Sequence, residues 1–148
     1  MTEADPLYND WIHQQLRVQP DGLALYDLTA DRPFSWRQFN DRVDALAHRL
    51  IAENVGPGDR VAYLGLNSSD VVEIFFATVR IGAVYVPLNF RLTAPELSFI
   101  IGDCTPSAVI YDRAFQGVID AIETSVMPPV LIETALDGSD SGYEQCLI

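Results

Sequence analysis

The sequence predicts an α/β fold, in which a doubly wound, mostly parallel sheet carries helices on both faces and a small hairpin lies near the N-terminus. Three observations support this prediction. Short apolar segments alternate with longer amphipathic segments along most of the 148 residues. Several of the apolar segments are unbroken runs, which is typical of parallel strands buried on both faces. The connections are short, so right-handed crossovers bring the elements into one layered unit.

The first third of the chain predicts a helix, a hairpin and a second, longer helix. Asp5 is a candidate N-cap, followed by Pro6 at the first helical position. Residues 23–36 read as two short strands joined by the turn "TADR". Ser35 is a candidate N-cap for a helix of about 36–53, whose apolar residues recur every three or four positions and form one face.

The next segment predicts a strand over 60–66 and a helix over 70–81. Ser68 or Ser69 is placed to cap this helix. Because the helix is apolar on most sides, we expect it to be well buried. Gly82 is placed to end it in the left-handed conformation.

A further strand and helix are expected over 83–88 and 94–102. The helix carries a capping-box pattern, with Thr93 as N-cap, Pro95 in the first turn and Glu96 three residues after the cap.

The last part of the chain predicts a strand over 106–112, a helix over 113–126 and a strand over 128–133. We therefore assign residues 1–133 to one α/β subdomain. Residues 134–148 are rich in Gly, Ser and Asp, and we expect a polar, truncated tail without a regular element.

Composition excludes several classes of function. The net charge is −12 and no basic stripe is present, so nucleic-acid binding is not expected. No apolar run approaches the ~20 residues of a membrane span, and no signal peptide is recognisable at the start. These features predict a cytoplasmic protein.

The residue inventory also limits the chemistry. All nine basic residues are arginines, so the lysine of a phosphate-binding P-loop and lysine Schiff-base chemistry are absent. His13, His48, Cys104 and Cys146 lack the spacing of metal ligands, and we expect no metal site. No catalytic set of residues has a local signature.

Charged residues within the predicted helices are expected at the surface. Glu73, Glu96 and Asp103 all fall on helices, where a charged side chain normally faces solvent. We therefore expect none of them to act in catalysis.

Ligands of open α/β sheets bind beyond the carboxyl ends of the strands, and two such ends carry polar residues. In "GLNSSD", residues 65–70, the serines either cap the next helix or leave its N–H groups open to an anion. In "PLNFRLT", residues 87–93, Asn89 is suited to a turn. Arg91 either pairs with a carboxylate of its own domain or reaches outward to a phosphate.

Three stretches, "GDRVAYLGLNS", "GAVYVPLNFRLT" and "PEL", resemble the AMP-forming acyl-CoA synthetases, an adenylate-forming family. The resemblance covers about residues 8–133 and implies part of the large N-terminal domain of these ligases. Its "PLNFRLTAPEL" stretch is similar to fatty-acyl or aryl CoA ligases. The implied reaction joins a carboxylate to CoA, with ATP converted to AMP and pyrophosphate. ATP, Mg²⁺ and CoA are the implied cofactors of a full-length enzyme.

The resemblance also assigns a role to the turn after the fourth strand. It places Arg91 near the CoA-binding side, where its guanidinium would meet a CoA phosphate, and Asn89 and Phe90 shape the same turn. The family's lysine-containing phosphate loop, its adenine-binding motif and its C-terminal domain are not found in these residues.

We therefore expect an N-terminal fragment that binds no cofactor and is inactive alone. Its expected partner is the rest of the same polypeptide, and exposed apolar surface favours a homodimer as well. The alternative is a stand-alone α/β binding or interaction domain without catalysis.

Overall fold

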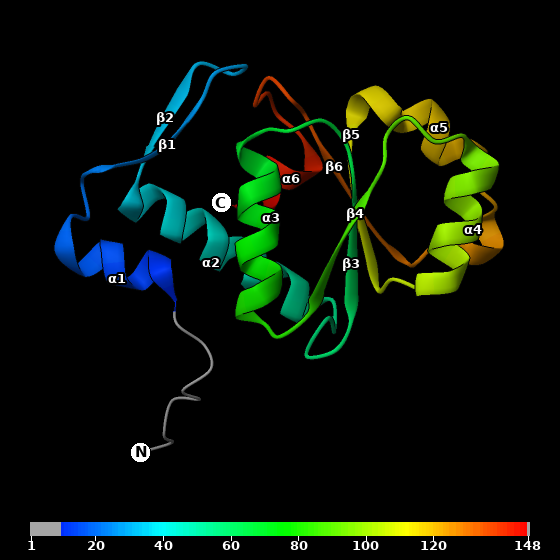
Figure 1. The fold of residues 1–148 in the computed structure, drawn as a ribbon, viewed down its shortest axis with the longest axis horizontal. Coiled ribbons are helices and arrows are strands. Elements are labelled where there is room, and N and C mark those ends of the chain that lie inside the picture. Colours follow the sequence, from blue (N-terminus) through cyan, green and yellow to red (C-terminus); the bar gives the residue numbers. More distant parts are fainter. Residues whose placement is uncertain (1–9, 148) are drawn as a thin grey trace.

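A computed structural model describes residues 10–147 of the chain and contains a four-stranded parallel sheet between two layers of helices (Figure 1). The strand order is β4-β3-β5-β6, and every neighbouring pair is parallel. The predicted fold class is confirmed. The strands are β3 (Arg60–Leu64), β4 (Val84–Leu88), β5 (Ala108–Asp112) and β6 (Val130–Thr134).

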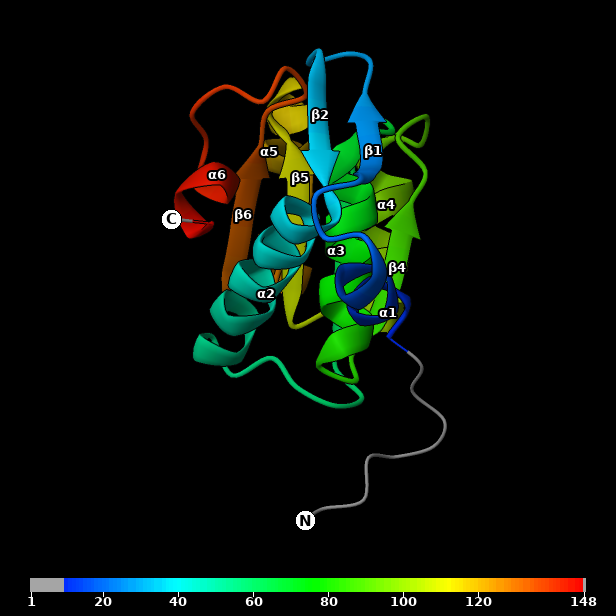
Figure 2. The same ribbon diagram turned by 90° about the vertical axis from the view of Figure 1, so that its left-hand side faces the viewer.

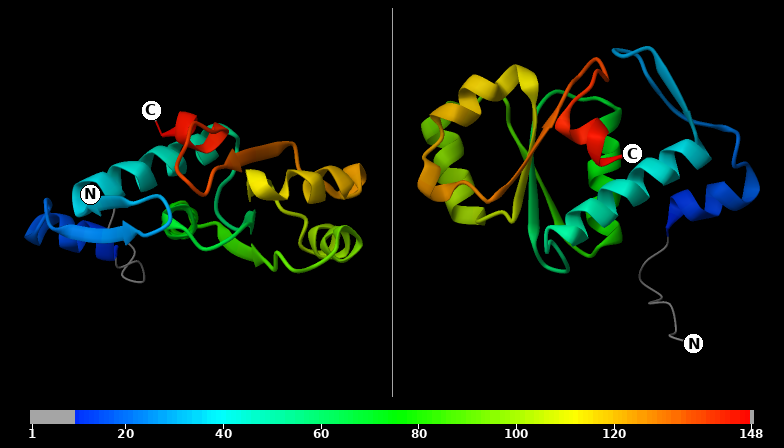
Figure 3. Two further views of the ribbon diagram at one scale, coloured as in Figure 1. Left: turned by 90° about the horizontal axis from the view of Figure 1, so that it is seen from above. Right: turned by 180° about the vertical axis from the view of Figure 1, so that it is seen from behind.

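The helices form a layer on each face of the sheet, as the unbroken apolar strands predicted. One layer holds α2, α3 and α6, with α1 packed outside α2, and the other holds α4 and α5 (Figures 1 and 3). No helix of the described part is long and apolar enough to cross a membrane. The helical elements are α1 (Trp11–Val18), α2 (Trp36–Ala52), α3 (Ser69–Arg80), α4 (Ala94–Cys104), α5 (Gln116–Ala121) and α6 (Gly142–Cys146), with short 3-10 turns η1 (Arg113–Phe115) and η2 (Thr124–Val126).

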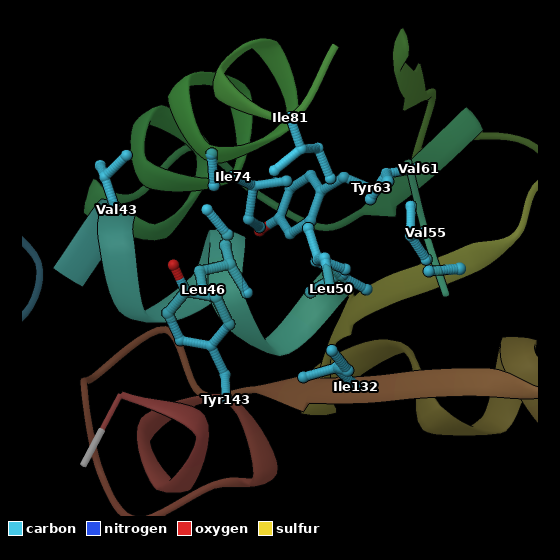
Figure 4. Close-up of a cluster of buried hydrophobic side chains, with 14 of the residues drawn as sticks. Val43, Leu46, Leu50, Val55, Val61, Tyr63, Ile74, Ile81, Ile132 and Tyr143 are labelled. Atoms are coloured by element: carbon cyan, nitrogen blue, oxygen red, sulfur yellow. The ribbon is translucent and has the colours of Figure 1, made fainter. Parts of the chain in front are cut away.

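Two apolar clusters form because successive residues of the central strands point to opposite faces. On β3, Val61 and Tyr63 enter the cluster beneath α2 and α3, whereas Ala62 and Leu64 enter the cluster beneath α4. The first cluster is shown in Figure 4, where helices α2 and α3, strand β6 and Tyr143 contribute side chains to it.

Local signals set the ends of several elements as predicted. Ser35 caps α2, accepting a hydrogen bond from the Gln38 backbone N–H at 3.2 Å. At α4, Glu96 accepts hydrogen bonds from the backbone N–H and the hydroxyl of Thr93, at 2.8 and 2.7 Å. Gly82 has a φ of 73°, in the left-handed region that favours glycine.

Two predicted helices have other bounds in the structure. The segment 113–126 is not one helix, because Ile122 is extended (φ −73°, ψ 143°) and separates α5 from η2. The proposed cap at Asp5 and Pro6 lies outside the described residues. Within the described part, α1 begins at Trp11 and is capped by the carboxylate of Asp10.

The segment after β6 contains a helix that was not predicted, α6 (Figure 2). The Gly/Ser/Asp-rich composition indicated no regular element, but Ser141 caps α6 through the backbone N–H of Glu144 at 3.2 Å. Tyr143 is fully buried in the cluster shared by α2 and α3, and its hydroxyl donates to Glu73 at 2.7 Å. One aromatic side chain therefore docks a polar segment onto the core.

A two-stranded hairpin of β1 (Leu23–Asp27) and β2 (Arg32–Ser35) lies beside this helix layer, as predicted for residues 23–36 (Figure 2). Its link to α3 is the buried carboxylate of Asp27, which accepts hydrogen bonds from the backbone N–H and the hydroxyl of Ser69 at 3.0 and 2.8 Å. Ser68 holds the N-cap position but makes no capping hydrogen bond, so the predicted serine cap is wrong.

The contacts of Tyr143 predict that Tyr143→Ala lowers the free energy of unfolding by about 3–5 kcal/mol, because a fully buried aromatic ring leaves a cavity. Chemical denaturation of the 148-residue chain measures this. The control is Tyr26→Ala, at a half-exposed tyrosine bonded to Asp31. Equal losses for the two variants would contradict the docking of α6.

The contacts of Asp27 predict that Asp27→Ala destabilises the chain by about 1.5–3 kcal/mol, because buried N–H and O–H donors at the start of α3 lose a charged acceptor. Asp21→Ala is the matched control, since Asp21 forms only an exposed ion pair with Arg37. Thermal unfolding of both variants tests the difference. A loss of stability in Asp27→Ala no greater than that in the control would refute the role of Asp27 in linking the hairpin to α3.

Candidate functional site

The strand order places a topological switch point between β3 and β5. The chain passes from β3 to β4 on one side and then crosses to β5 on the other side. In open α/β sheets, ligands bind near the carboxyl ends of strands at such a point. The turns that follow β3, β4 and β5 are therefore the candidate site.

The turn after β4 is held by its own backbone and by Asn89. The side-chain oxygen of Asn89 accepts from the backbone N–H of Arg91 at 3.0 Å, and its carbonyl accepts from the N–H of Leu92 at 3.1 Å. The Thr93–Glu96 capping box follows directly, and hydrogen bonds from Thr93 lower the pKa of Glu96. The turn is thus fixed on both sides of Arg91.

The side chain of Arg91 is exposed and rests on an aromatic surface. Its guanidinium carbon lies 5.1 Å from the centre of the Phe90 ring. Phe90 in turn packs against Phe115, with 5.9 Å between ring centres. Arginine stacks readily on aromatic faces, and this contact orients the charged end without neutralising it.

Arg91 forms no ion pair with another described residue, which separates it from most arginines of the chain. Six arginines pair with carboxylates, and Arg60 donates to the backbone carbonyls of Cys104 and Thr105. Arg17, exposed on α1, also forms no ion pair within residues 10–147. The internal carboxylate partner that the sequence allowed for Arg91 is therefore not seen. The paired arginines are Arg32, Arg37, Arg42, Arg49, Arg80 and Arg113.

Phe115 is a residue of this site that the sequence did not indicate. It lies in η1, which starts where the buried Asp112 at the end of β5 accepts from the N–H of Ala114 at 2.8 Å. The sequence predicted a single helix over 113–126, and within such a helix Phe115 would be interpreted as a core residue of one face, not as part of a site. The turn after β5 in fact brings Phe115 to the turn after β4.

The second candidate, the N-terminus of α3 after "GLNSSD", is occupied by the chain itself. The carboxylate of Asp27 takes the place of an external anion there, because it accepts hydrogen bonds from the backbone N–H and the hydroxyl of Ser69. Burial opposes ionisation of Asp27, but hydrogen bonds from the backbone of Ser69 and Ala30 lower its pKa. An external phosphate would have to displace this carboxylate.

A buried cluster of charged residues links α3 to α2 and α6. Glu73 was expected to face solvent, and this is wrong because its side chain is fully buried. Arg42 Nε donates to Glu73 at 2.6 Å, and its two Nη atoms donate to the carboxylate of Glu144 at 2.9 and 2.8 Å. Glu96 and Asp103 are exposed as predicted. The signal for Glu73 was available, since a charge on a helix that is apolar on most sides must be buried and paired.

The same cluster includes the hairpin through Arg32, which donates to Glu144 at 3.1 Å. Arg32 lies 3.7 Å from Asp70, the nearest guanidinium contact that Asp70 has among the described residues. Burial raises the pKa of Asp70 to about 7, and the charge of Glu73 adds to this. Burial alone would also raise the pKa of Glu144, but the hydrogen bonds from Arg42 and Arg32 lower it.

The described residues contain no group of three or more His, Cys, Asp or Glu side chains arranged to hold a metal ion. Chemically, the exposed site at the sheet edge offers one free guanidinium on an aromatic support. Such a site suits an anionic group and lacks an acid–base pair or a nucleophile.

Comparison with known proteins identifies relatives along nearly the whole chain. Residues 12–145 match the model of the AMP-binding enzyme family. The long-chain-fatty-acid–CoA ligase FadD13 of Mycobacterium tuberculosis is 37% identical over 134 residues, which are 90% of this chain and 26% of that protein. Indoleacetate–CoA ligase of Aromatoleum aromaticum is 33% identical over 135 residues, with 91% and 26% covered.

Solved structures agree with these relatives. A fatty acyl CoA synthetase of Mycobacterium tuberculosis has a TM-score of 0.79 at 34% identity, covering 92% of this chain and 27% of that one. The anthranilate CoA ligase AuaEII in complex with anthranoyl-AMP has a TM-score of 0.81 at 27% identity, covering 97% and 28%. This chain spans about a quarter of the length of these relatives and corresponds to the N-terminal part of their fold. The chain belongs to the AMP-binding enzyme family.

Proposed function

We propose that this chain is the N-terminal part of an AMP-forming acyl-CoA ligase that acts on a fatty or aromatic carboxylic acid. The reaction joins the carboxylate to ATP, releases pyrophosphate, and then transfers the acyl group from AMP to the thiol of CoA. The family match and the CoA ligases among the relatives support this proposal.

Within that reaction, Arg91 binds a phosphate of CoA. The observation that carries this role is the exposed guanidinium at the carboxyl edge, stacked on Phe90 and without an ion pair to another described residue. Guanidinium groups bind phosphate through paired, charge-assisted hydrogen bonds. Asn89 fixes the backbone of Arg91, and Phe90 supports its side chain, so both act by positioning.

The described residues do not fit ATP or Mg²⁺. The chain has no lysine to contact the phosphates of ATP, and the helix N-terminus that follows β3 is occupied by Asp27. The chemistry on ATP is therefore assigned to other parts of the ligase. This chain contributes the layered scaffold and one wall of the CoA site.

Replacing Arg91 by alanine in the full-length ligase should raise the KM for CoA about 10- to 150-fold, the effect of losing one charged hydrogen-bonding partner. The KM for ATP should change less than the KM for CoA. Steady-state kinetics with each substrate varied in turn measures both.

Arg17→Ala is the matched control for Arg91→Ala, because Arg17 is also an exposed arginine without an ion pair to another described residue. It should leave both KM values unchanged. A CoA KM that is the same in Arg91→Ala and in the control would refute the proposed role.

The 148-residue chain alone should not release pyrophosphate from ATP in the presence of fatty or aromatic acids. The reason is the lack of any lysine and of an ATP site among the described residues. A coupled pyrophosphate assay, with a full-length ligase as positive control, tests this. Pyrophosphate release that depends on the added carboxylic acid would refute the proposal that other parts of the ligase carry out the chemistry on ATP.

A further inference from the structure

The buried cluster beside α3 has more acidic than basic groups. It contains the carboxylates of Asp70, Glu73 and Glu144 and the guanidiniums of Arg32 and Arg42. A fourth carboxylate, that of Asp27, is balanced by the N–H groups of Ser69, Thr29 and Ala30. Asp70, Glu73, Glu144, Arg32 and Arg42 together carry one negative charge in excess when all five are ionised, and burying an unpaired charge is costly.

Burial raises the pKa of both Asp70 and Glu73, and the donors around the three carboxyl groups distinguish them. Glu73 accepts a hydrogen bond from Arg42 at 2.6 Å and another from the hydroxyl of Tyr143 at 2.7 Å. Glu144 accepts two hydrogen bonds from Arg42. Asp70 is buried, with 2% of its side chain exposed, but its nearest guanidinium nitrogen is 3.7 Å away. Its one hydrogen bond among the described residues is long, from the hydroxyl of Ser69 at 3.4 Å, so Asp70 is the carboxyl group with the poorest compensation.

We propose that Asp70 is the proton switch of a latch that holds α6 against α2 and α3. With Asp70 protonated, the two arginines balance Glu73 and Glu144, and the latch is closed. When Asp70 ionises, it attracts Arg32 away from Glu144 and repels Glu144 directly, so α6 loosens.

The elements around Asp70 all contribute charged or titratable groups. The pKa of Asp70, raised to about 7 by burial, places the change near neutral pH. A folded pKa above the ordinary value means that the cluster favours the closed state at lower pH, and this stabilisation is lost as the pH rises through about 7. The groups facing Asp70 are Asp27 and Arg32 from the hairpin, Tyr63 from β3, Arg42 from α2, Glu73 from α3, and Tyr143 and Glu144 from α6.

α6 is the element that responds, because it has the least other support. It spans five residues, Gly142–Cys146, of which Tyr143 alone is buried. Helix α3, in contrast, buries residues along its whole length, from Ser69 to Thr78. Local opening is easiest where few buried contacts hold an element.

Hydrogen–deuterium exchange of the 148-residue chain at pH 5.5 and 8.5 tests the latch. After correction for the intrinsic exchange rate, protection of the α6 amides should fall about tenfold or more between the two pH values, while β5 stays unchanged. Asp70→Asn should keep α6 protected at both pH values. Asp103→Asn, at an exposed aspartate of α4, should behave as the unmodified chain.

Three results would overturn the proposal: equal α6 protection at both pH values, a parallel loss in β5, or a pH dependence that survives in Asp70→Asn. A second measurement does not depend on a folded variant. The carbon NMR signal of the Asp70 carboxyl in the unmodified chain should titrate between pH 6 and 8. A carboxyl that is fully ionised by pH 5 would also exclude the latch.

Discussion

The central strands β3 and β5 must be covered on both faces, and the rest of the structure depends on this constraint. Apart from Arg60 at its start, every residue of these strands is buried, alternating between two apolar clusters. Covering both faces requires crossovers in both directions, so β4 and β5 lie on opposite sides of β3. The turns after β4 and β5 then meet at one edge, which packs Phe90, the ring beneath Arg91, against Phe115 although 25 residues separate the two rings.

The helix layer of α2, α3 and α6 is held together by ion pairs as well as by apolar contacts. Arg42 binds Glu73 and Glu144 at once, so α2, α3 and α6 share one guanidinium. Buried ion pairs are weak evidence for stability, because desolvation offsets much of their attraction. In this structure they tie three helices together, since Nε of Arg42 binds Glu73 while its two Nη atoms bind Glu144. A polar segment such as α6 therefore has a fixed position without a large apolar face.

The sequence predicted elements whose causes are local and missed contacts whose causes are distant. The left-handed Gly82, the Ser35 cap and the Thr93–Glu96 capping box follow from neighbouring residues, and the structure confirms them. The docking of Tyr143 depends on a hydroxyl acceptor 70 residues away. The cap of α3 comes from Asp27, 42 residues upstream, so two serines in an ideal local position were misread. The position of Arg91 was predictable, but the packing of Phe115 against Phe90, the ring beneath Arg91, required the strand order.

The arginines show how a chain without lysine divides its positive charge. Most arginines are committed to carboxylates or carbonyls, and these contacts fix helices, hairpin and strand ends. A guanidinium that is paired with a carboxylate has its charge balanced and some of its donors occupied, so it is less available to an anionic ligand. Arg91 differs because a rigid turn and an aromatic ring hold it, and neither consumes its charge. Arg91 therefore stays charged and exposed at the edge where ligands of such sheets bind.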